Sequence, residues 1–296
     1  VAELKLSTSD TLSNPSVEAH IASDRTKSGQ YAAQSIAGTV RAQMRDEDIT
    51  ARYSFASRGV ETPQAMAALL TAEGRVRARQ NFGMLDIEAD IEGNGLRLGR
   101  ELGGALSRLA TVGDGTLIDP IVRRISSSLQ AQTRGSALEL GLRLRSDKRG
   151  LVISIPQGEL RGRGGTRLAS LSRLEYSARE GRPTRLSGNI STGGPGLPRI
   201  RGRMERSGRG ASLFSLSMAE YEAGGSSLAI PRLSLTRGES GALVFSGYVE
   251  ATGKLPGGAV DRLTLPIDGR WSPDSNLALW RDCAKISFRR LRFAQL

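Results

Sequence analysis

Alternation of apolar and polar residues between Ala137 and Ile155 constrains the fold more than any other feature of this sequence. Leucine occupies every second position from Leu138 to Leu144, and after a polar turn at residues 146–150 the alternation resumes. Successive side chains of a strand point to opposite faces, so a period of two predicts a strand with one apolar and one polar face. Two such runs across a short turn predict an antiparallel hairpin. What covers the apolar face is therefore the central question for function.

The residues after Ser136 repeat this design without any helical pattern. Glycine-marked turns follow one another at intervals of 13 to 17 residues. No repeated motif accompanies them, which predicts a regular meander. Some strands change phase, and the stretch from Ile230 to Leu233, across Pro231, predicts a bulge. The residues that we expect to line an apolar groove share the apolar side of these strands: Leu138, Leu140, Leu142, Leu144, Leu151, Ile153, Ile155, Phe214, Leu216, Met218, Leu243, Phe245, Val249, Leu263, Leu265 and Ile267.

Residues 1–98 predict a front β segment that contains one short helix near residues 63–73. Thr62 and Pro63 resemble a helix N-cap followed by proline at the first helical position. Gly74 would then end the helix.

The hydrophobic spacing changes near Gly99 from two to three and four, which predicts an amphipathic helical pair within residues 99–134. Residues 135–296 form the predicted rear antiparallel β ladder. We expect the leucines of its first hairpin to lie nearest the helices and residues 263–271 to be the most open. We also expect the chain to be a fragment of a longer protein, because it begins at Val1 and its last residues still have a strand pattern.

A sheet of this length needs something to cover its apolar face. About ten antiparallel strands in the rear segment approach the limit at which open sheets curl or split. Strands of about eight residues span about 26 Å, so one helical pair covers only part of the face. Aromatic residues, at 4%, are too few to fill the rest. We therefore predict a mainly β fold, with long antiparallel meander sheets curled into an elongated groove and one helical pair inserted mid-chain. An apolar trough of this kind suits acyl chains.

Composition and motifs do not support catalysis or metal binding. The chain has one His, His20, and one Cys, Cys283, so a disulfide within the chain is excluded and a protein-only zinc site is not supported. A Ser-His-Asp triad would require His20, for which a surface position is the favoured interpretation. The glycine-rich stretch 93–99 nearly matches a dinucleotide-binding fingerprint, but its spacing is one residue too long and a hairpin turn at Asn94-Gly95 is favoured. We predict no enzyme activity, no cofactor and no catalytic, cofactor-binding or metal-binding residue.

The net charge of +12 comes from 42 basic and 30 acidic residues. Such an excess is typical of proteins that bind nucleic acids or anionic headgroups. Arginine is scattered through every segment, however, and the aromatic stacking partners of a single-strand binder are missing. We interpret most of the arginines as the solvated residues of strand faces and predict no nucleic-acid partner.

Three C-terminal stretches carry a family resemblance: LTLPIDGRW (263–271), LALWRDC (277–283) and FRRLRFAQL (288–296). They resemble the C-terminal region of the YdbH family, which belongs to the AsmA-like group that includes TamB. Residues 12–23 and the mid-chain helices fit the same resemblance. Trp271 continues the apolar side of its strand, so core packing accounts for it.

The resemblance implies a long periplasmic protein that is anchored to the inner membrane through a segment not present in this chain. Its β-sheet groove would bridge the two membranes of a Gram-negative envelope and carry phospholipids. The partners implied are phospholipids, the membrane through regions outside this chain, and an outer-membrane or periplasmic protein.

Three functions remain open from the sequence. The first is a non-enzymatic lipid conduit, in which apolar strand faces shield phospholipid acyl chains while headgroups stay in water. The second is a structural β-scaffold with a dry closed core that docks partner proteins. The third, an envelope enzyme acting on polysaccharide, would need a pair of acidic residues around a pocket, and the sequence places none there.

Overall fold

The computed structural model describes residues 2–7, 15–79, 82–111, 114–206, 212–237, 242–272, 277–280 and 283–293. Within these residues the chain is mainly β, with antiparallel strands and two helices. This confirms the predicted mainly β antiparallel meander with one helical pair inserted mid-chain. The chain divides into two compact units, which we describe separately. Unit 1 comprises residues 1–103, 132–166 and 171–184, and unit 2 comprises residues 104–131, 167–170 and 185–296.

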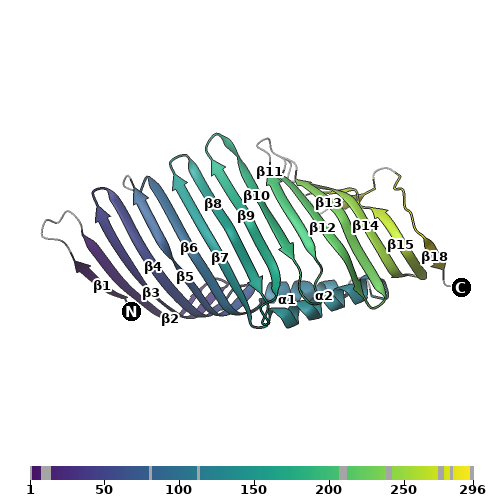
Figure 1. Cartoon of the computed structure of the whole chain (residues 1–296), viewed down its shortest axis with the longest axis horizontal. Helices are drawn as coiled ribbons and strands as arrows, with labels where there is room; N and C mark the ends of the chain where they lie inside the picture. The colour runs from purple at the N-terminus through teal and green to yellow at the C-terminus, as the bar shows by residue number, and fades with distance from the viewer. Residues whose placement is uncertain are drawn as a thin grey trace. The chain divides into compact units, whose positions relative to one another are not determined.

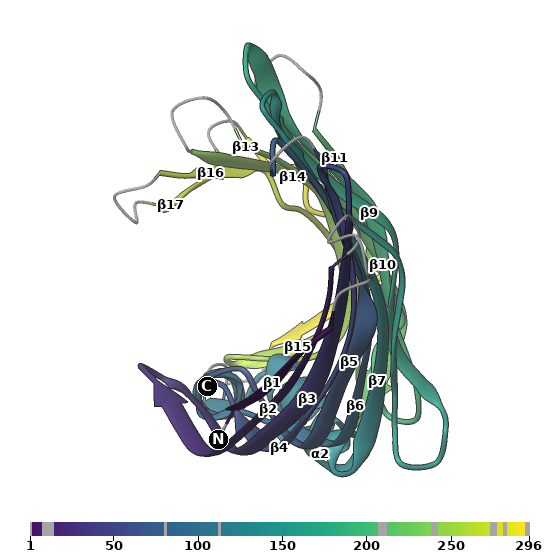
Figure 2. The same cartoon turned by 90° about the vertical axis from the view of Figure 1, so that its left-hand side faces the viewer.

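Unit 1 is an antiparallel sheet in which each strand pairs with the next one along the chain, as Figure 1 shows. The backbone N–H of Glu180 donates to the carbonyl of Arg149 at 2.8 Å, which ties the end of β9 to the start of β8. Strands β2 to β7 curve along their length (Figure 2). The strands of this sheet are β1 (Ala2–Ser7), β2 (Ser16–Ser28), β3 (Tyr31–Arg45), β4 (Asp48–Glu61), β5 (Ala65–Arg79), β6 (Met84–Leu98), β7 (Ser136–Asp147), β8 (Gly150–Arg161) and most of β9 (Arg167–Arg179).

The short helix expected near residues 63–73 is wrong, because residues 65–73 belong to strand β5 and residues 63–64 form the bend before it. The capping chemistry of Thr62 is present but serves a tight turn: its side-chain oxygen accepts a hydrogen bond from the N–H of Ala65 at 2.9 Å. Pairing with β4 on one side and β6 on the other satisfies the backbone groups of β5. Two flanking strands thus outweigh a local helix signal, as tertiary context often does.

The hairpin turn expected at Asn94-Gly95 is also wrong. Strand β6 continues through Leu98, and Gly95 is an extra residue in its pairing with β7. Gly95 has a φ of +65°, a left-handed conformation that glycine adopts without strain. The glycine therefore makes a bulge in one strand and not a turn between two strands.

Unit 2 combines antiparallel strands with most of the helical pair. The predicted helices are confirmed as α1 (Arg100–Thr111) and α2 (Ile118–Thr133). The strands from β10 to β15 pair in chain order, β16 pairs with β14 and β17, and β18 pairs with β15. They are β10 (Arg182–Thr192), most of which belongs to unit 2, β11 (Ile200–Arg206), β12 (Ser212–Ala223), β13 (Ser226–Arg237), β14 (Leu243–Leu255), β15 (Gly258–Pro266), β16 (Gly269–Trp271), β17 (Leu277–Leu279) and β18 (Arg290–Phe293).

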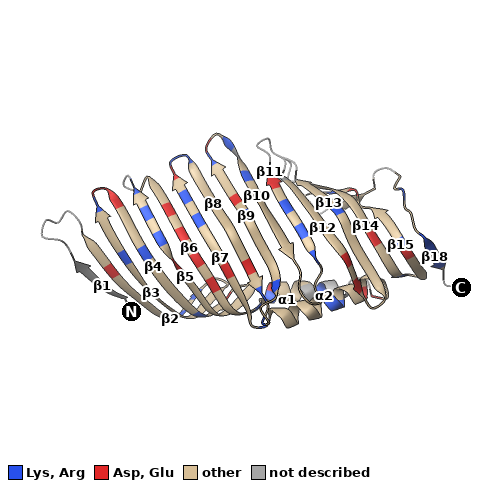
Figure 3. Ribbon diagram, viewed as in Figure 1, with Lys and Arg blue, Asp and Glu red and all other residues tan. Residues whose placement is uncertain are grey.

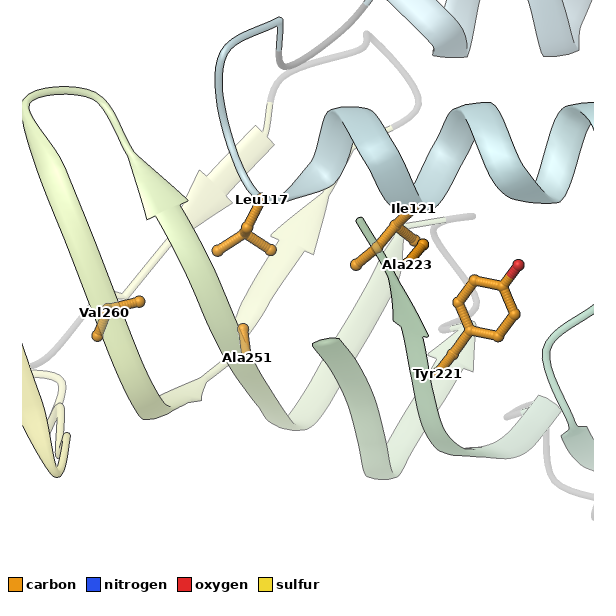
Figure 4. Close-up of a cluster of buried hydrophobic side chains, with 6 residues drawn as sticks. All are labelled: Leu117, Ile121, Tyr221, Ala223, Ala251 and Val260. Atoms are coloured by element: carbon orange, nitrogen blue, oxygen red, sulfur yellow. The ribbon is translucent and has the colours of Figure 1, made fainter. Parts of the chain in front are cut away.

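Helix α2 packs on the strands of unit 2, and the side chains between helix and strands form a buried core. Leu117 and Ile121, which are 5% and 2% exposed, point toward the strands (Figure 4). The backbone N–H of Leu117 donates to the carbonyl of Lys254 at 2.7 Å, which fixes the start of the helix to β14. The strand residues that complete this cluster of buried side chains are Tyr221, Ala223, Ala251 and Val260.

Candidate functional site

Cross-strand pairing in unit 1 aligns apolar residues from neighbouring strands into rows. One row contains Phe55 of β4, Ala72 of β5, Ile91 of β6, Leu140 of β7 and Gly158 of β8. A second row contains Ala51, Val76, Ile87, Leu144 and Ile153. It lies four residues away along β4 to β7 and five along β8, which contains a bulge. Directly paired side chains lie on the same side of a sheet. We call this side, with the residues of these rows and of the rows beside them, the apolar face of unit 1.

The residues predicted in the first hairpin all lie on this face. Leu138, Leu140, Leu142 and Leu144 of β7 pair with Gly93, Ile91, Ala89 and Ile87 of β6. On β8, Leu151 and Ile153 pair with Ser146 and Leu144. Ile155 lies two residues further along β8, next to a bulge at Pro156 and Gln157.

The apolar face of unit 1 has no covering layer of side chains among the described residues of that unit. The apolar residues that are buried there are small: Ala67, Ala78 and Ala89 are 2–8% exposed. The larger side chains beside them, such as Leu142 and Ile153, are only half-buried. In a closed core large aliphatic residues are the ones most often fully buried, as Ile121 of helix α2 is. The face of unit 1 is therefore an apolar surface in which alanines are the most deeply buried residues and the larger side chains beside them remain partly exposed.

Glycines let large side chains lie flat on this face. Gly38 of β3 pairs with Phe55, and a Cβ at position 38 would overlap the Phe55 ring. Tyr53 lies over Gly74, and its hydroxyl donates to the carbonyl of Glu88 on β6 at 3.1 Å. Burial, and then the nearby Asp90 carboxylate, raise the pKa of Tyr53. A side chain that covers a facing glycine fills the gap in the sheet without projecting far above it.

The residues predicted in the rear strands lie on the apolar face of unit 2. Phe214 and Leu216 of β12 pair with Leu235 and Leu233 of β13, and Leu235 pairs in turn with Phe245 of β14. Val249 pairs with Leu265. The N–H of Ile267 donates to the carbonyl of Gly247 at 2.8 Å, directly beyond the end of β15. Phe214, Leu216, Leu243, Phe245, Val249, Leu263, Leu265 and Ile267 are half-buried, and Met218 is 7% exposed.

Helix α2 covers one end of this second face. Val249 and Leu263 pack against the buried cluster beneath the helix. The expectation that residues 263–271 are the most open is therefore wrong for Leu263. The expected core packing of Trp271 is also wrong, because β15 ends at Pro266 and Trp271, on the separate strand β16, is 51% exposed.

Several changes of phase in the apolar pattern coincide with a bulge. In β6 the apolar positions are odd-numbered up to Gly93 and even-numbered from Leu96, and the extra residue is Gly95. In β8 the change occurs between Ile155 and Gly158. Register shifts accompany the corresponding changes in β12, β13 and β15, which confirms the bulge predicted across Pro231. An extra residue returns the following side chains to the original face, so the apolar face continues along each strand.

The opposite face of unit 1 is charged. Arg, Asp and Glu recur along β4 to β7, as the blue and red segments of Figure 3 show. Ion pairs across the strands join Arg41 to Glu18 at 2.9 Å and Arg145 to Asp86 at 2.7 Å. The hydrogen bond from Arg145 to Asp86 raises the pKa of the guanidinium. The His20 side chain is 51% exposed, which confirms the predicted surface position.

The described residues contain no group of three or more His, Cys, Asp or Glu side chains arranged to hold a metal ion. Within the same residues, no helix is both long and apolar enough to span a bilayer.

The sequence prediction missed the front half of the apolar face. Ile49 to Phe55 and Leu85 to Ile91 alternate as strictly as the rear strands, and pairing places them in the same rows as Leu140 and Leu144. The alternation identified them as strands, but their place beside β7 depends on the register of β5 and β6. For the same reason, the sequence did not identify the strands on which helix α2 packs.

Comparison with known protein families matches the chain to the family described as "YdbH-like: Intermembrane phospholipid transport protein YdbH" over residues 2–296. The three C-terminal stretches and residues 12–23 fall within this range, although 12–14, 281–282 and 294–296 lie outside the described residues. No curated protein sequence matches the chain.

Proposed function

The chain belongs to the YdbH-like family of intermembrane phospholipid transport proteins, and we propose that its apolar faces shield phospholipid acyl chains during that transport. The chain would form a segment of a periplasmic bridge between inner and outer membrane, anchored to the inner membrane through a segment outside this chain. Headgroups would stay in water while the acyl chains lie on the strands. Non-enzymatic transfer of this kind requires burial of the chains without chemical change.

The observation that carries this proposal is the state of the apolar face of unit 1. Its large side chains are half-buried over a floor of alanines, with no second layer of described side chains in that unit. A contiguous apolar surface that extends across several strands typically marks a site where a partner removes it from water. An acyl chain would gain about 0.8 kcal/mol for each methylene group that the face buries.

The face also has few polar groups that could hold a ligand in one place. Its rows consist of Ala, Val, Ile, Leu, Gly and aromatic residues, with occasional serines such as Ser57 and Ser146. Non-directional contacts of this kind bind an acyl chain at many neighbouring positions with similar free energy. Movement along the sheet is then favoured over tight binding at one site.

Site-specific photo-crosslinking tests the proposal by comparing the two faces. Ile153 and Leu142 lie on the apolar face, whereas Ser54 and Arg52 of β4 pair with Glu73 and Arg75 on the charged face. A photoreactive amino acid at Ile153 or Leu142 is expected to crosslink phospholipid, detected by mass spectrometry, and one at Ser54 or Arg52 is not. Equal crosslinking from both faces, or none from either, would overturn the proposal. Absence of lipid from every position would favour the structural scaffold.

A further inference from the structure

Three adjacent strands of unit 1 place arginines and carboxylates in a regular pattern on the charged face. In each of two neighbouring rows, an acidic residue of β6 lies between an arginine of β5 and an arginine of β7. The rows are Arg75–Glu88–Arg143 and Arg77–Asp86–Arg145. The residues of one row lie two positions from those of the other along each strand, so all six side chains project from the same side of the sheet.

This arrangement leaves an excess of positive charge. Glu88 forms an ion pair with Arg75 at 2.6 Å, and Asp86 forms one with Arg145 at 2.7 Å. Within the described part of the chain, neither Arg77 nor Arg143 has an ion-pair partner. Each carboxylate thus pairs with one arginine. Arg77 on β5 and Arg143 on β7, one from each row, lie on opposite sides of β6.

The same residues surround a hollow of about 340 Å³ in this face. Arg179 at the end of β9 adds a fifth arginine to its lining, and Val152 and Ser154 of β8 complete one wall. Five guanidinium groups against two carboxylates give the hollow a net charge of +3. Its volume is at the lower end of the range for small-ligand sites, which is roughly 300–1,000 Å³.

The chemistry of arginine indicates what such a hollow would bind. The planar guanidinium group donates two parallel hydrogen bonds to phosphate or carboxylate oxygens. Several guanidinium groups held on one rigid sheet repel one another, and an anion with two or more negative charges relieves this repulsion. Acyl chains on the apolar face cannot occupy the hollow, because it lies on the other side of the backbone.

We propose that the hollow formed by β5, β6, β7 and β8 binds a phosphate-bearing anion, such as a phosphomonoester or two adjacent phosphate groups. This binding is separate from the shielding of acyl chains and does not depend on it. Arg77 and Arg143 are the main ligands, while Arg75 and Arg145 remain oriented by Glu88 and Asp86.

Isothermal titration calorimetry of the full chain with inorganic pyrophosphate tests the proposal. The variants are Arg77→Gln and Arg143→Gln, and the control is Arg52→Gln. Arg52 is exposed on the same face, pairs with Arg75 and does not line the hollow. We expect each hollow variant to weaken binding about ten-fold, the control to change it less than two-fold, and affinity to fall steeply as salt rises. Thermal melts of all variants verify that the fold is retained.

Two further binding experiments identify the source of the phosphate and test an acidic protein segment as the alternative partner. Co-sedimentation with phosphatidylglycerol vesicles that depends on Arg77 and Arg143 would assign the phosphate to a lipid headgroup, and binding of pyrophosphate alone would assign it to a soluble anion. Both results support a phosphate site. Binding of polyglutamate without binding of either phosphate ligand would overturn it in favour of an acidic protein segment. Equal affinity of wild type and hollow variants for pyrophosphate would also overturn it.

Discussion

Replacing Leu142 by glutamate is expected to weaken lipid binding strongly while leaving the sheet folded. Leu142 is half-buried and pairs with Ala89, which is 7% exposed, so its side chain stands beside one of the lowest points of the apolar face. Neighbouring strands lie about 4.8 Å apart, so an acyl chain that crosses them places roughly four methylene groups over one side chain. At about 0.8 kcal/mol for each methylene, a carboxylate that keeps them hydrated removes about 3 kcal/mol of binding free energy. This corresponds to roughly a 100-fold increase in Kd.

Titration of a fluorescent phospholipid into the purified chain measures this loss. The control is Arg52→Glu, which introduces the same group on the charged face at a residue that does not line the arginine hollow. We expect Leu142→Glu to lower the free energy of unfolding by less than the full 2–5 kcal/mol of a buried leucine, because the side chain is only half-buried. Urea unfolding separates that effect from lipid binding. A change in Kd of less than about three-fold for Leu142→Glu, or an equal change for Arg52→Glu, would refute an acyl chain on this face.

Three further predictions test the packing beneath the two faces. Gly38→Ala is expected to lower stability by about 1–3 kcal/mol because its Cβ would overlap the Phe55 ring. The loss in a double variant with Phe55→Ala, measured by urea unfolding, should be smaller than the sum of the single losses, and strict additivity would contradict the contact. Ile121→Ala is expected to cost about 2–5 kcal/mol, because this side chain of α2 packs against the strands and is only 2% exposed. A loss below about 1 kcal/mol in the same assay would contradict that burial. Tyr53 has its pKa raised by burial and then by Asp90, so its contribution to stability is complete below the ordinary phenol pKa and is lost as pH rises through the higher folded value. Absorbance at 295 nm during alkaline titration should show this late ionisation, and Tyr53→Phe should remove it.

Local alternation was enough to predict the strands, but not which neighbours they would have. Leu138 to Leu144 and Phe245 were placed on apolar faces because a period of two fixes the face of each residue. Thr62 and Pro63 misled the prediction because the same side-chain hydrogen bond serves a helix N-cap and a tight turn. The choice between them is made by β4 and β6, which pair with β5 over most of its length.

The candidate sites depended even more on long-range pairing. The sequence shows that Ile121 belongs to an amphipathic helix but not that its apolar side meets Tyr221 and Val260, about 100 residues or more along the chain. The arginines of the charged hollow were interpreted as scattered solvated residues. Arg77 and Arg143 are far apart in sequence, and only the registers of β5, β6 and β7 bring them around the same carboxylates.

The bulges give an independent reason to regard the apolar face as a functional requirement. A bulge leaves one residue unpaired and disrupts the ladder locally, so a sheet stabilised only by its hydrogen bonds would keep one phase along each strand. In β8 the apolar positions change from Ile155 to Gly158 and Leu160, and the bulge at Pro156 and Gln157 returns them to one face. Without the extra residue, Leu160 would point to the charged face and Glu159 to the apolar face. Continuity of the apolar surface therefore outweighs the cost of interrupted pairing, which agrees with the proposed shielding of acyl chains along this face.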